Sequence, residues 1–255
     1  MKKKVTPKAK KLTPKAKKTA PKKASAKTKK KSTVKKESTH IIAVLDRSGS
    51  MSSVAQAAID GFNEFLGSQK KLKDKATMSG VLFSDPDKIE ALFEGKTLDV
   101  KDVPELTMEK FRPDGWTALC DAIGKSVNNY KATEAGKAGK EKVLVLIITD
   151  GAENKSIEFN KKDIFDLITY QKKQNWQFIF LCSTEDAFKV GADFGVAAGN
   201  TFKFENSNLG NKKLYNKVAK ATANYRGMTM YDAFYATAPD GSLKSEKLMA
   251  DIEDD

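Results

Sequence analysis

Apolar and polar residues are arranged along the chain in blocks that predict strands and helices in alternation. Residues 41–45 form an unbroken apolar run rich in β-branched side chains, and residues 143–148 form a second one. Runs of this kind are typical of strands buried on both faces, as in a parallel sheet. Elsewhere apolar residues recur at steps of three and four, which indicates amphipathic helices. We therefore expect strands and helices to follow one another.

The complete pattern predicts a doubly wound α/β fold. Strands are expected at 41–45, 77–83, 89–93, 143–148, 177–181 and 201–204, and helices near 55–66, 117–130, 164–168, 187–194 and 214–225. The turn Ser84-Asp85-Pro86-Asp87 joins two of the strands into a hairpin. The sheet is then mostly parallel, with one antiparallel edge strand, right-handed crossovers and helices on both faces. Residues 131–142 indicate a charged surface loop.

Charge is distributed unevenly and divides the chain into three parts. Residues 1–37 contain 17 of the 46 basic residues and one of the 33 acidic ones, whereas the rest of the chain has a net charge of −3. This Lys/Pro/Ala-rich segment has no aromatic residue, so no core offsets the entropy of ordering it. We expect a disordered basic tail at 1–37, a folded domain at 38–226, and a C-terminal extension with an acidic end at 227–255.

Such a tail favours salt-sensitive, sequence-independent contact with nucleic acid or another polyanion, although targeting and solubility are open alternatives. No apolar run approaches the ~20 residues that cross a membrane, and no secretory signal follows the basic start. Cys120 and Cys182 are far apart with no histidine near them, which favours buried free thiols. These features favour an intracellular protein with no membrane partner: cytoplasmic or, because of the tail, nuclear or virion-associated.

Oxygen-bearing side chains follow the first predicted strand directly. Asp46, Ser48 and Ser50 stand at alternate positions. In an extended segment such residues point the same way, so they can present three oxygens at the carboxyl edge of the sheet. One carboxylate and two hydroxyls suit Mg²⁺ or another hard divalent cation.

These residues, with two more, resemble the metal-ion-dependent adhesion site (MIDAS) of the von Willebrand factor type A (vWA) family. Asp-x-Ser-x-Ser follows the first strand, Thr117 precedes a predicted helix, and Asp150 ends the most apolar strand. The resemblance covers about residues 40–226. Lacking a signal peptide and disulfides, the chain is most similar to intracellular bacterial and viral members.

The resemblance implies a metal site with a position open to a partner. Its ligands would be Asp46, Ser48, Ser50, Thr117 and Asp150. Mg²⁺ is the expected ion, with Mn²⁺ and Ca²⁺ as alternatives. Because most of these ligands are neutral, the ion would keep positive charge and attract an acidic side chain of a partner protein.

The sequence gives little support to an enzymatic function. No serine-hydrolase elbow, Walker loop or paired-glycine dinucleotide motif is present. The only histidine, His40, precedes the apolar run of the first strand, so a Ser-His-Asp arrangement lacks a base. Metal-assisted hydrolysis through Asp46 and Asp150 stays open as a minor alternative.

Two functional hypotheses follow. In the first, the protein is a non-enzymatic, divalent-metal-dependent protein-binding module whose basic tail contacts nucleic acid or another polyanion. In the second, it is a nucleic-acid-associated packaging or compaction protein in which the folded domain is mainly a scaffold.

Overall fold

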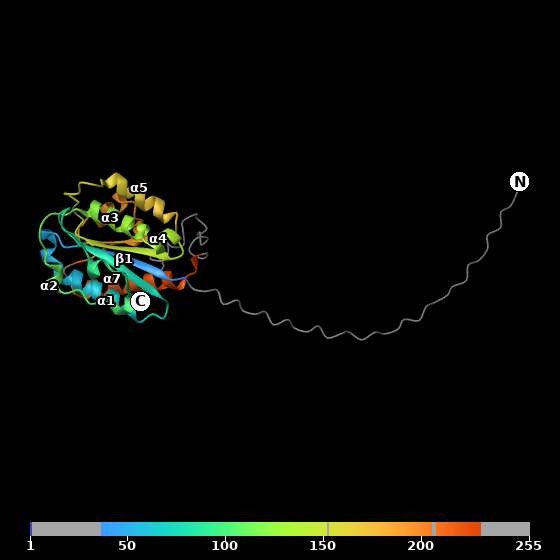
Figure 1. Cartoon of the computed structure of the whole chain (residues 1–255), viewed down its shortest axis with the longest axis horizontal. Helices are drawn as coiled ribbons and strands as arrows, with labels where there is room; N and C mark the ends of the chain where they lie inside the picture. The colour runs from blue at the N-terminus through green and yellow to red at the C-terminus, as the bar shows by residue number, and fades with distance from the viewer. Residues whose placement is uncertain (2–36, 152, 206–207, 231–255) are drawn as a thin grey trace. The chain divides into compact units, whose positions relative to one another are not determined.

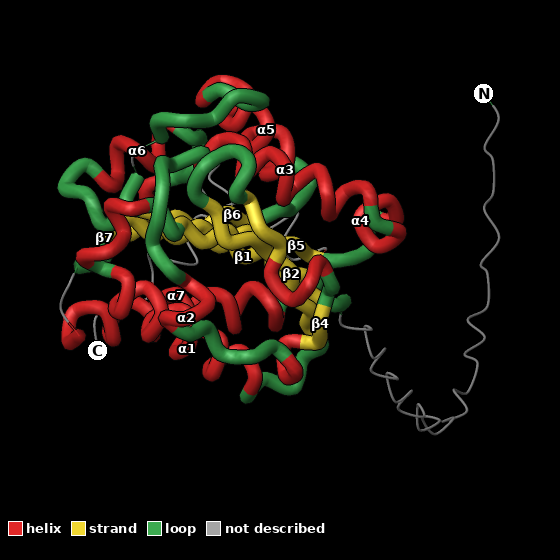
Figure 2. Tube along the Cα trace, turned by 60° about the vertical axis from the view of Figure 1, so that its left-hand side comes forward, coloured by secondary structure: helices red, strands yellow, loops and turns green. Residues whose placement is uncertain are grey.

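One sheet between two layers of helices makes up the folded domain. The computed structural model describes residue 1 and residues 37–151, 153–205 and 208–230. Figure 1 and Figure 2 show α1, α2 and α7 on one face of the sheet, and α3, α4 and α5 on the other. The predicted basic tail, except Met1 and Glu37, and the extension beyond Met230 lie outside the described residues.

Within the described residues, seven strands form the sheet, and the longer ones follow from their apolar content. They are β1 (Thr39–Asp46), β2 (Ala76–Phe83), β3 (Ile89–Ala91), β4 (Leu98–Asp99), β5 (Lys142–Thr149), β6 (Gln177–Cys182) and β7 (Thr201–Lys203). The order is β3-β2-β1-β5-β6-β7, with β4 also paired to β2. All pairs are parallel except those that β3 and β4 make with β2. The predicted fold class is confirmed, and β4 adds a second antiparallel strand.

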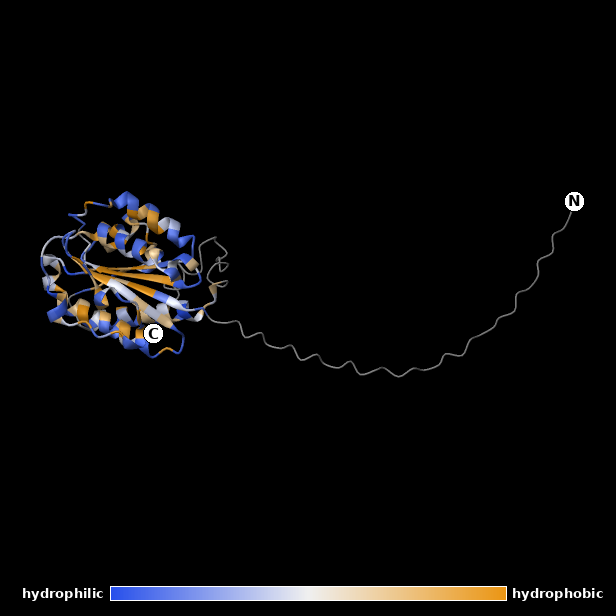
Figure 3. Ribbon diagram, viewed as in Figure 1, coloured by the Kyte–Doolittle hydropathy of each residue, from blue (hydrophilic) through white to orange (hydrophobic). Residues whose placement is uncertain are grey.

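Amphipathic helices cover both faces of this sheet. They are α1 (Ala55–Lys70), α2 (Met108–Phe111), α3 (Leu119–Ala132), α4 (Glu134–Ala138), α5 (Lys161–Lys172), α6 (Ala187–Asp193) and α7 (Asn208–Gly227). Alternate residues of β1 enter two separate cores: Ile41 and Ala43 pack on the α1 side, and Ile42 and Val44 on the α3 side. Figure 3 shows the resulting pattern of hydrophobic strands beneath helices with hydrophilic outer faces. Among the described residues, no helix combines the length and apolar character needed to cross a bilayer.

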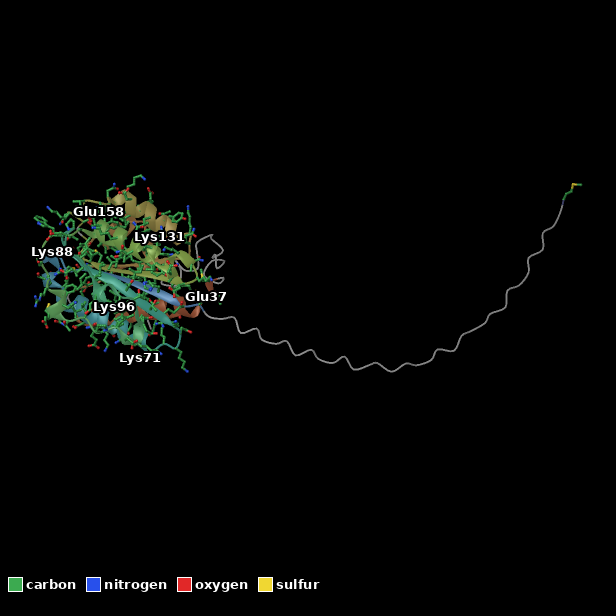
Figure 4. All side chains as sticks on the ribbon, viewed as in Figure 1. Glu37, Lys71, Lys88, Lys96, Lys131 and Glu158 are labelled. Atoms are coloured by element: carbon green, nitrogen blue, oxygen red, sulfur yellow. The ribbon has the colours of Figure 1, made fainter. Side chains whose placement is uncertain are left out.

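Parallel pairing without stagger brings the ends of three strands together. Leu45 of β1 is opposite Ile148 of β5, and Asp46 is opposite Phe83 of β2. The segments that follow these strands therefore leave the sheet at one edge, which we call the carboxyl edge. In Figure 4, Lys88, just after β2, lies at the opposite end of the domain from Glu37, just before β1.

Lys142 departs from the prediction of a charged surface loop at 131–142. The segment contains α4, and Lys142 begins β5 with its side chain almost fully buried. Its ammonium donates hydrogen bonds to the carbonyls of Tyr225 at 2.7 Å and Arg226 at 2.6 Å, and to that of Met228. These carbonyls belong to the last turn of α7 and the residues after it, where a helix leaves backbone acceptors unpaired. Lys142 therefore fixes the end of α7 to the central strand.

Replacing Lys142 by Met tests this role. The variant keeps the aliphatic stem but removes a donor from three carbonyls, of which that of Tyr225 has another donor, the backbone N–H of Met228 at 3.3 Å. We therefore expect the free energy of unfolding to fall by about 3 kcal/mol. Urea unfolding monitored by circular dichroism measures the change. The exposed Lys140 provides the matched control, because Lys140→Met should change stability by less than about 0.5 kcal/mol. Equal stability of the two variants would contradict this role.

His40 is the second residue inside β1 rather than a residue before the strand. It is buried, lies between the hydroxyls of Thr77 and Ser79 at 2.8 Å each, and stacks on Tyr130 with ring centroids 4.3 Å apart. Burial lowers the pKa of His40 to about 4, although the charge of Glu141 acts in the opposite direction. The imidazole is therefore a neutral core group.

This environment makes the stability contribution of His40 depend on pH. The side chain stays neutral in the folded state down to about pH 4, whereas in the unfolded chain it takes up a proton near pH 6.5. Its contribution is thus complete above pH 6.5 and is lost as the pH falls towards 4, by up to about 3 kcal/mol. As the pH falls from 6.5 towards 4, the free energy of unfolding of wild type, measured by urea unfolding, should therefore fall by up to about 3 kcal/mol more than that of His40→Gln. Parallel curves for the two proteins would refute the assignment.

Candidate metal centre

Asp46 ends β1 and is an enclosed carboxyl group at the carboxyl edge. Its side chain is fully buried. One carboxyl oxygen accepts a hydrogen bond from the backbone N–H of Ser48 at 2.7 Å, and the other from the hydroxyl of Thr149 at 2.6 Å. Because Thr149 ends β5, this second bond joins the ends of the two central strands.

No basic side chain among the described residues neutralises Asp46. The neighbouring Arg47 turns away and pairs with Glu90 at 2.7 Å. Burial is the main cause that raises the pKa of Asp46 to about 6. Hydrogen bonds from Thr149 and Ser48 act against the rise, and the charge of Asp150 adds to it. A buried carboxylate with neutral donors and a like charge nearby is the environment that a bound cation would stabilise.

Ser48 and Ser50 are brought together by a different geometry from the extended segment that the alternating sequence predicts. The chain turns into a 3₁₀ helix at Gly49–Ser53, so the two-residue alternation ends at Ser48. The hydroxyl oxygens of the two serines are nevertheless 3.2 Å apart. Ser48 is buried, whereas Ser50 is exposed, so this pair links the interior to the surface.

The loop that carries Thr117 is bonded to the Asp46 turn. The N–H of Gly49 donates to the carbonyl of Gly115 at 3.0 Å, and the N–H of Asp114 donates to the carbonyl of Arg47 at 2.8 Å. Gly115 has a φ of +75°, and a Cβ there would lie 2.3 Å from a carboxyl oxygen of Asp85, so only glycine fits. Thr117 follows in the same loop with its side chain buried.

Asp150 completes the predicted set from the end of β5. It is buried directly after Thr149, and its charge contributes to the raised pKa of Asp46. The structure therefore places all five predicted residues on three segments at one edge of the sheet. It joins the Asp46 turn by hydrogen bonds both to the Thr117 loop and to the end of β5.

Sequence reasoning missed the residues that hold these loops in place. The side-chain oxygen of Asn154 accepts from the backbone N–H of Thr117 at 3.0 Å, and the backbone N–H of Asn154 donates to the carbonyl of Thr117 at 3.1 Å. Asp121, fully buried in α3, accepts from the N–H groups of residues 157–159 at 2.8–3.0 Å. Of the residues that hold the site in place, only Thr149 could have been suspected from the sequence, because it is a polar residue at the end of an apolar strand and stands next to Asp150.

The donor set consists entirely of oxygen atoms. Within residues 37–151, 153–205 and 208–230, no three His, Cys, Asp or Glu side chains group as a site made of those ligands alone. The predicted set instead combines two carboxylates with three hydroxyls, which suits a hard divalent cation. Cys120 and Cys182 are free and buried, and burial raises the pKa of each thiol. Neither is suited to bind a metal as a thiolate.

Two hollows of the described structure lie away from the predicted ligands. One of about 450 Å³ lies along the segment between β3 and α2, and one of about 250 Å³ lies between that segment, β2 and α3; none of the five predicted ligands lines either one. The predicted set itself extends from the buried Asp46 to the exposed Ser50. It therefore reaches the surface at Ser50, where a macromolecule could contact it.

Comparison with known proteins identifies the domain. The sequence profile described as von Willebrand factor type A domain matches residues 40–217. No curated protein matches the chain. Among solved structures, the von Willebrand factor type A protein from Catenulispora acidiphila is 15% identical with a TM-score of 0.53, over 75% of this chain and 43% of that one. The pilus adhesin SpaC from Lactobacillus rhamnosus GG is 15% identical with a TM-score of 0.52, over 74% and 31% respectively. The chain thus matches less than half the length of either structure.

Proposed function

Since the chain belongs to the von Willebrand factor type A domain family, we propose that it is a non-enzymatic protein-binding module that depends on a divalent cation. The cation, Mg²⁺ in the first instance, is held by Asp46, Ser48, Ser50, Thr117 and Asp150. The family is a common carrier of interaction and adhesion sites, and the intact set of five oxygen donors supports the same use here.

The buried, unneutralised carboxylate of Asp46 is the observation that carries the proposal. Keeping a charge in the interior costs several kcal/mol unless a partner of opposite sign compensates it. The surrounding residues supply hydrogen bonds but no positive charge. A divalent cation would supply that charge and, through a vacant coordination position, Lewis acidity towards a carboxylate of the partner. Ser48 and Ser50 carry oxygen donors from Asp46 to the surface.

Asp46→Asn separates metal binding from folding. The amide keeps the shape of the side chain but removes the charge that attracts a cation. We expect wild type to gain about 2.7 kcal/mol of stability when Mg²⁺ is present at a hundred times its dissociation constant, and the variant to gain almost nothing. Chemical unfolding with and without Mg²⁺ measures this, and calorimetric titration with Mn²⁺ measures the affinity.

Asp114→Asn is the matched control, because Asp114 lies in the adjoining loop and pairs with the exposed Lys88 at 2.9 Å. It should respond to Mg²⁺ as wild type does. Failure of wild type to bind either ion would refute the proposed function. In affinity capture, partner binding should require both Mg²⁺ and an intact Asp46.

A second role, nucleic-acid attachment through residues 1–37, is supported by the concentration of charge there. This segment has a net charge of +16, while the remainder is mildly acidic. In the alternative function, packaging or compaction of nucleic acid, the folded domain would be mainly a scaffold. Both versions place polyanion contact in the tail, and only the first needs the metal centre.

Deleting residues 1–37 should abolish binding to duplex DNA, whereas Asp46→Ala should leave it unchanged. For the full chain, the logarithm of the affinity should fall linearly with the logarithm of salt concentration, because lysines displace counterions from phosphates. Fluorescence anisotropy with a labelled duplex at several salt concentrations measures both effects. An affinity that does not depend on salt would exclude this role for the tail.

A further inference from the structure

We infer that Trp116, Lys155 and Ile157 form a specificity-determining surface beside the metal centre, and that it takes a partner segment in which the metal-binding acid is followed by an apolar residue and a second acid. We call these three residues the Trp116 surface. The inference rests on the proposed function, because the first acid is the one that would reach the cation.

Trp116 is exposed although it is held in place on both sides. It stands between Gly115 and the predicted ligand Thr117, and 59% of its surface is accessible. Its backbone N–H donates to a carboxyl oxygen of Asp85 at 3.3 Å, and the next N–H, that of Thr117, is held by Asn154. An indole presented to solvent on a well-bonded loop loses little conformational entropy on binding. Such aromatic groups are enriched at the centres of protein interfaces.

Lys155 supplies a positive charge next to the indole. Its ammonium lies 5.6 Å from the centre of the Trp116 ring, and no carboxylate among the described residues pairs with it. Several acidic groups near the centre are already engaged. Asp85 and Asp114 pair with Lys88, and Glu90 pairs with Arg47. Lys155 thus adds a positive charge beside the indole to that of the proposed cation.

Ile157 adds a second apolar group on the same loop. It is 77% exposed, while its backbone N–H is fixed by the buried carboxylate of Asp121 at 3.0 Å. Ile157 thus accompanies the lysine on the segment that follows Asp150, and the indole of Trp116, on the Thr117 loop, provides the other apolar group. By contrast, Arg47 and Met51, which flank the serines in sequence, are buried and unavailable to a partner. The expected partner therefore presents apolar as well as acidic side chains.

The pair Tyr170 and Lys131 provides an internal control for this surface. Tyr170 on α5 is 58% exposed, and the ammonium of Lys131 lies 5.9 Å from its ring centre. Its exposure and chemistry match those of Trp116, but it is not next to any predicted metal ligand. Figure 4 shows Lys131 well away from Lys88, which marks the carboxyl edge.

The test uses the full chain with Mg²⁺ and a blocked synthetic peptide that carries Glu-Phe-Asp between serines. Two companion peptides have the Phe replaced by Ser or both acids replaced by amides. Salt at about 0.3 M screens attraction between the basic tail and the acids. Calorimetric titration measures peptide affinity, and titration with Mn²⁺ reports separately on the metal centre. Wild type, Trp116→Ala, Tyr170→Ala and Asp46→Asn are compared.

We expect the affinity of Trp116→Ala for the Glu-Phe-Asp peptide to be at least tenfold lower than that of wild type. Its affinities for Mn²⁺ and for the peptide in which Phe is replaced by Ser should equal those of wild type. Tyr170→Ala should match wild type in every titration, and Asp46→Asn should lose both Mn²⁺ and peptide. The inference is overturned if wild type binds Mn²⁺ but not the Glu-Phe-Asp peptide, or if both proteins bind Mn²⁺ and Trp116→Ala binds this peptide as tightly as wild type does. In either case the metal site stands. If wild type does not bind Mn²⁺, the proposed function itself is overturned.

Discussion

A carboxylate enclosed at the end of the first strand, with no basic side chain of the described residues paired to it, is the constraint on which the carboxyl edge of this sheet depends. Asp46 accepts hydrogen bonds from the backbone N–H of Ser48 and from the hydroxyl of Thr149. The loops around it are joined to one another by backbone hydrogen bonds, including those from Gly49 to Gly115 and from Asp114 to Arg47. This network keeps several oxygen donors close to a charge that the protein alone does not neutralise.

The two ends of the sheet handle buried charge in opposite ways. At the amino edge, the ammonium of Lys142 is surrounded by carbonyls at the end of α7, and His40 is held neutral by burial between two hydroxyls. Both of these groups find their polar partners within the fold. At the carboxyl edge, Asp46 and Asp150 are two like charges in one neighbourhood. The parallel sheet thus separates a buried ammonium and a neutral imidazole at one end from two neighbouring carboxylates at the other.

Strand and helix order followed from the sequence because long apolar runs and steps of three and four residues are strong local signals. The segments carrying the five predicted ligands also followed, since carboxyl ends of parallel strands share one edge. The 3₁₀ turn after Ser48, the two-residue strand β4 and the buried position of Lys142 did not follow. Each depends on contacts distant in sequence: the burial of Lys142, for example, depends on two carbonyls in the last turn of α7 and on that of Met228 after it. The loop-holding roles of Asn154 and Asp121 are invisible in sequence for the same reason.

The short strands at both margins of the sheet have a consequence for behaviour at high local concentration. β2 shares its outer side between β3 and β4, which together pair with only five of its residues, and the other margin ends in the three-residue β7. Short margins offer few free backbone groups in a row, so a second molecule has little template on which to add a strand. Contact between two copies of the domain at these margins would therefore depend on side chains rather than on extension of the sheet.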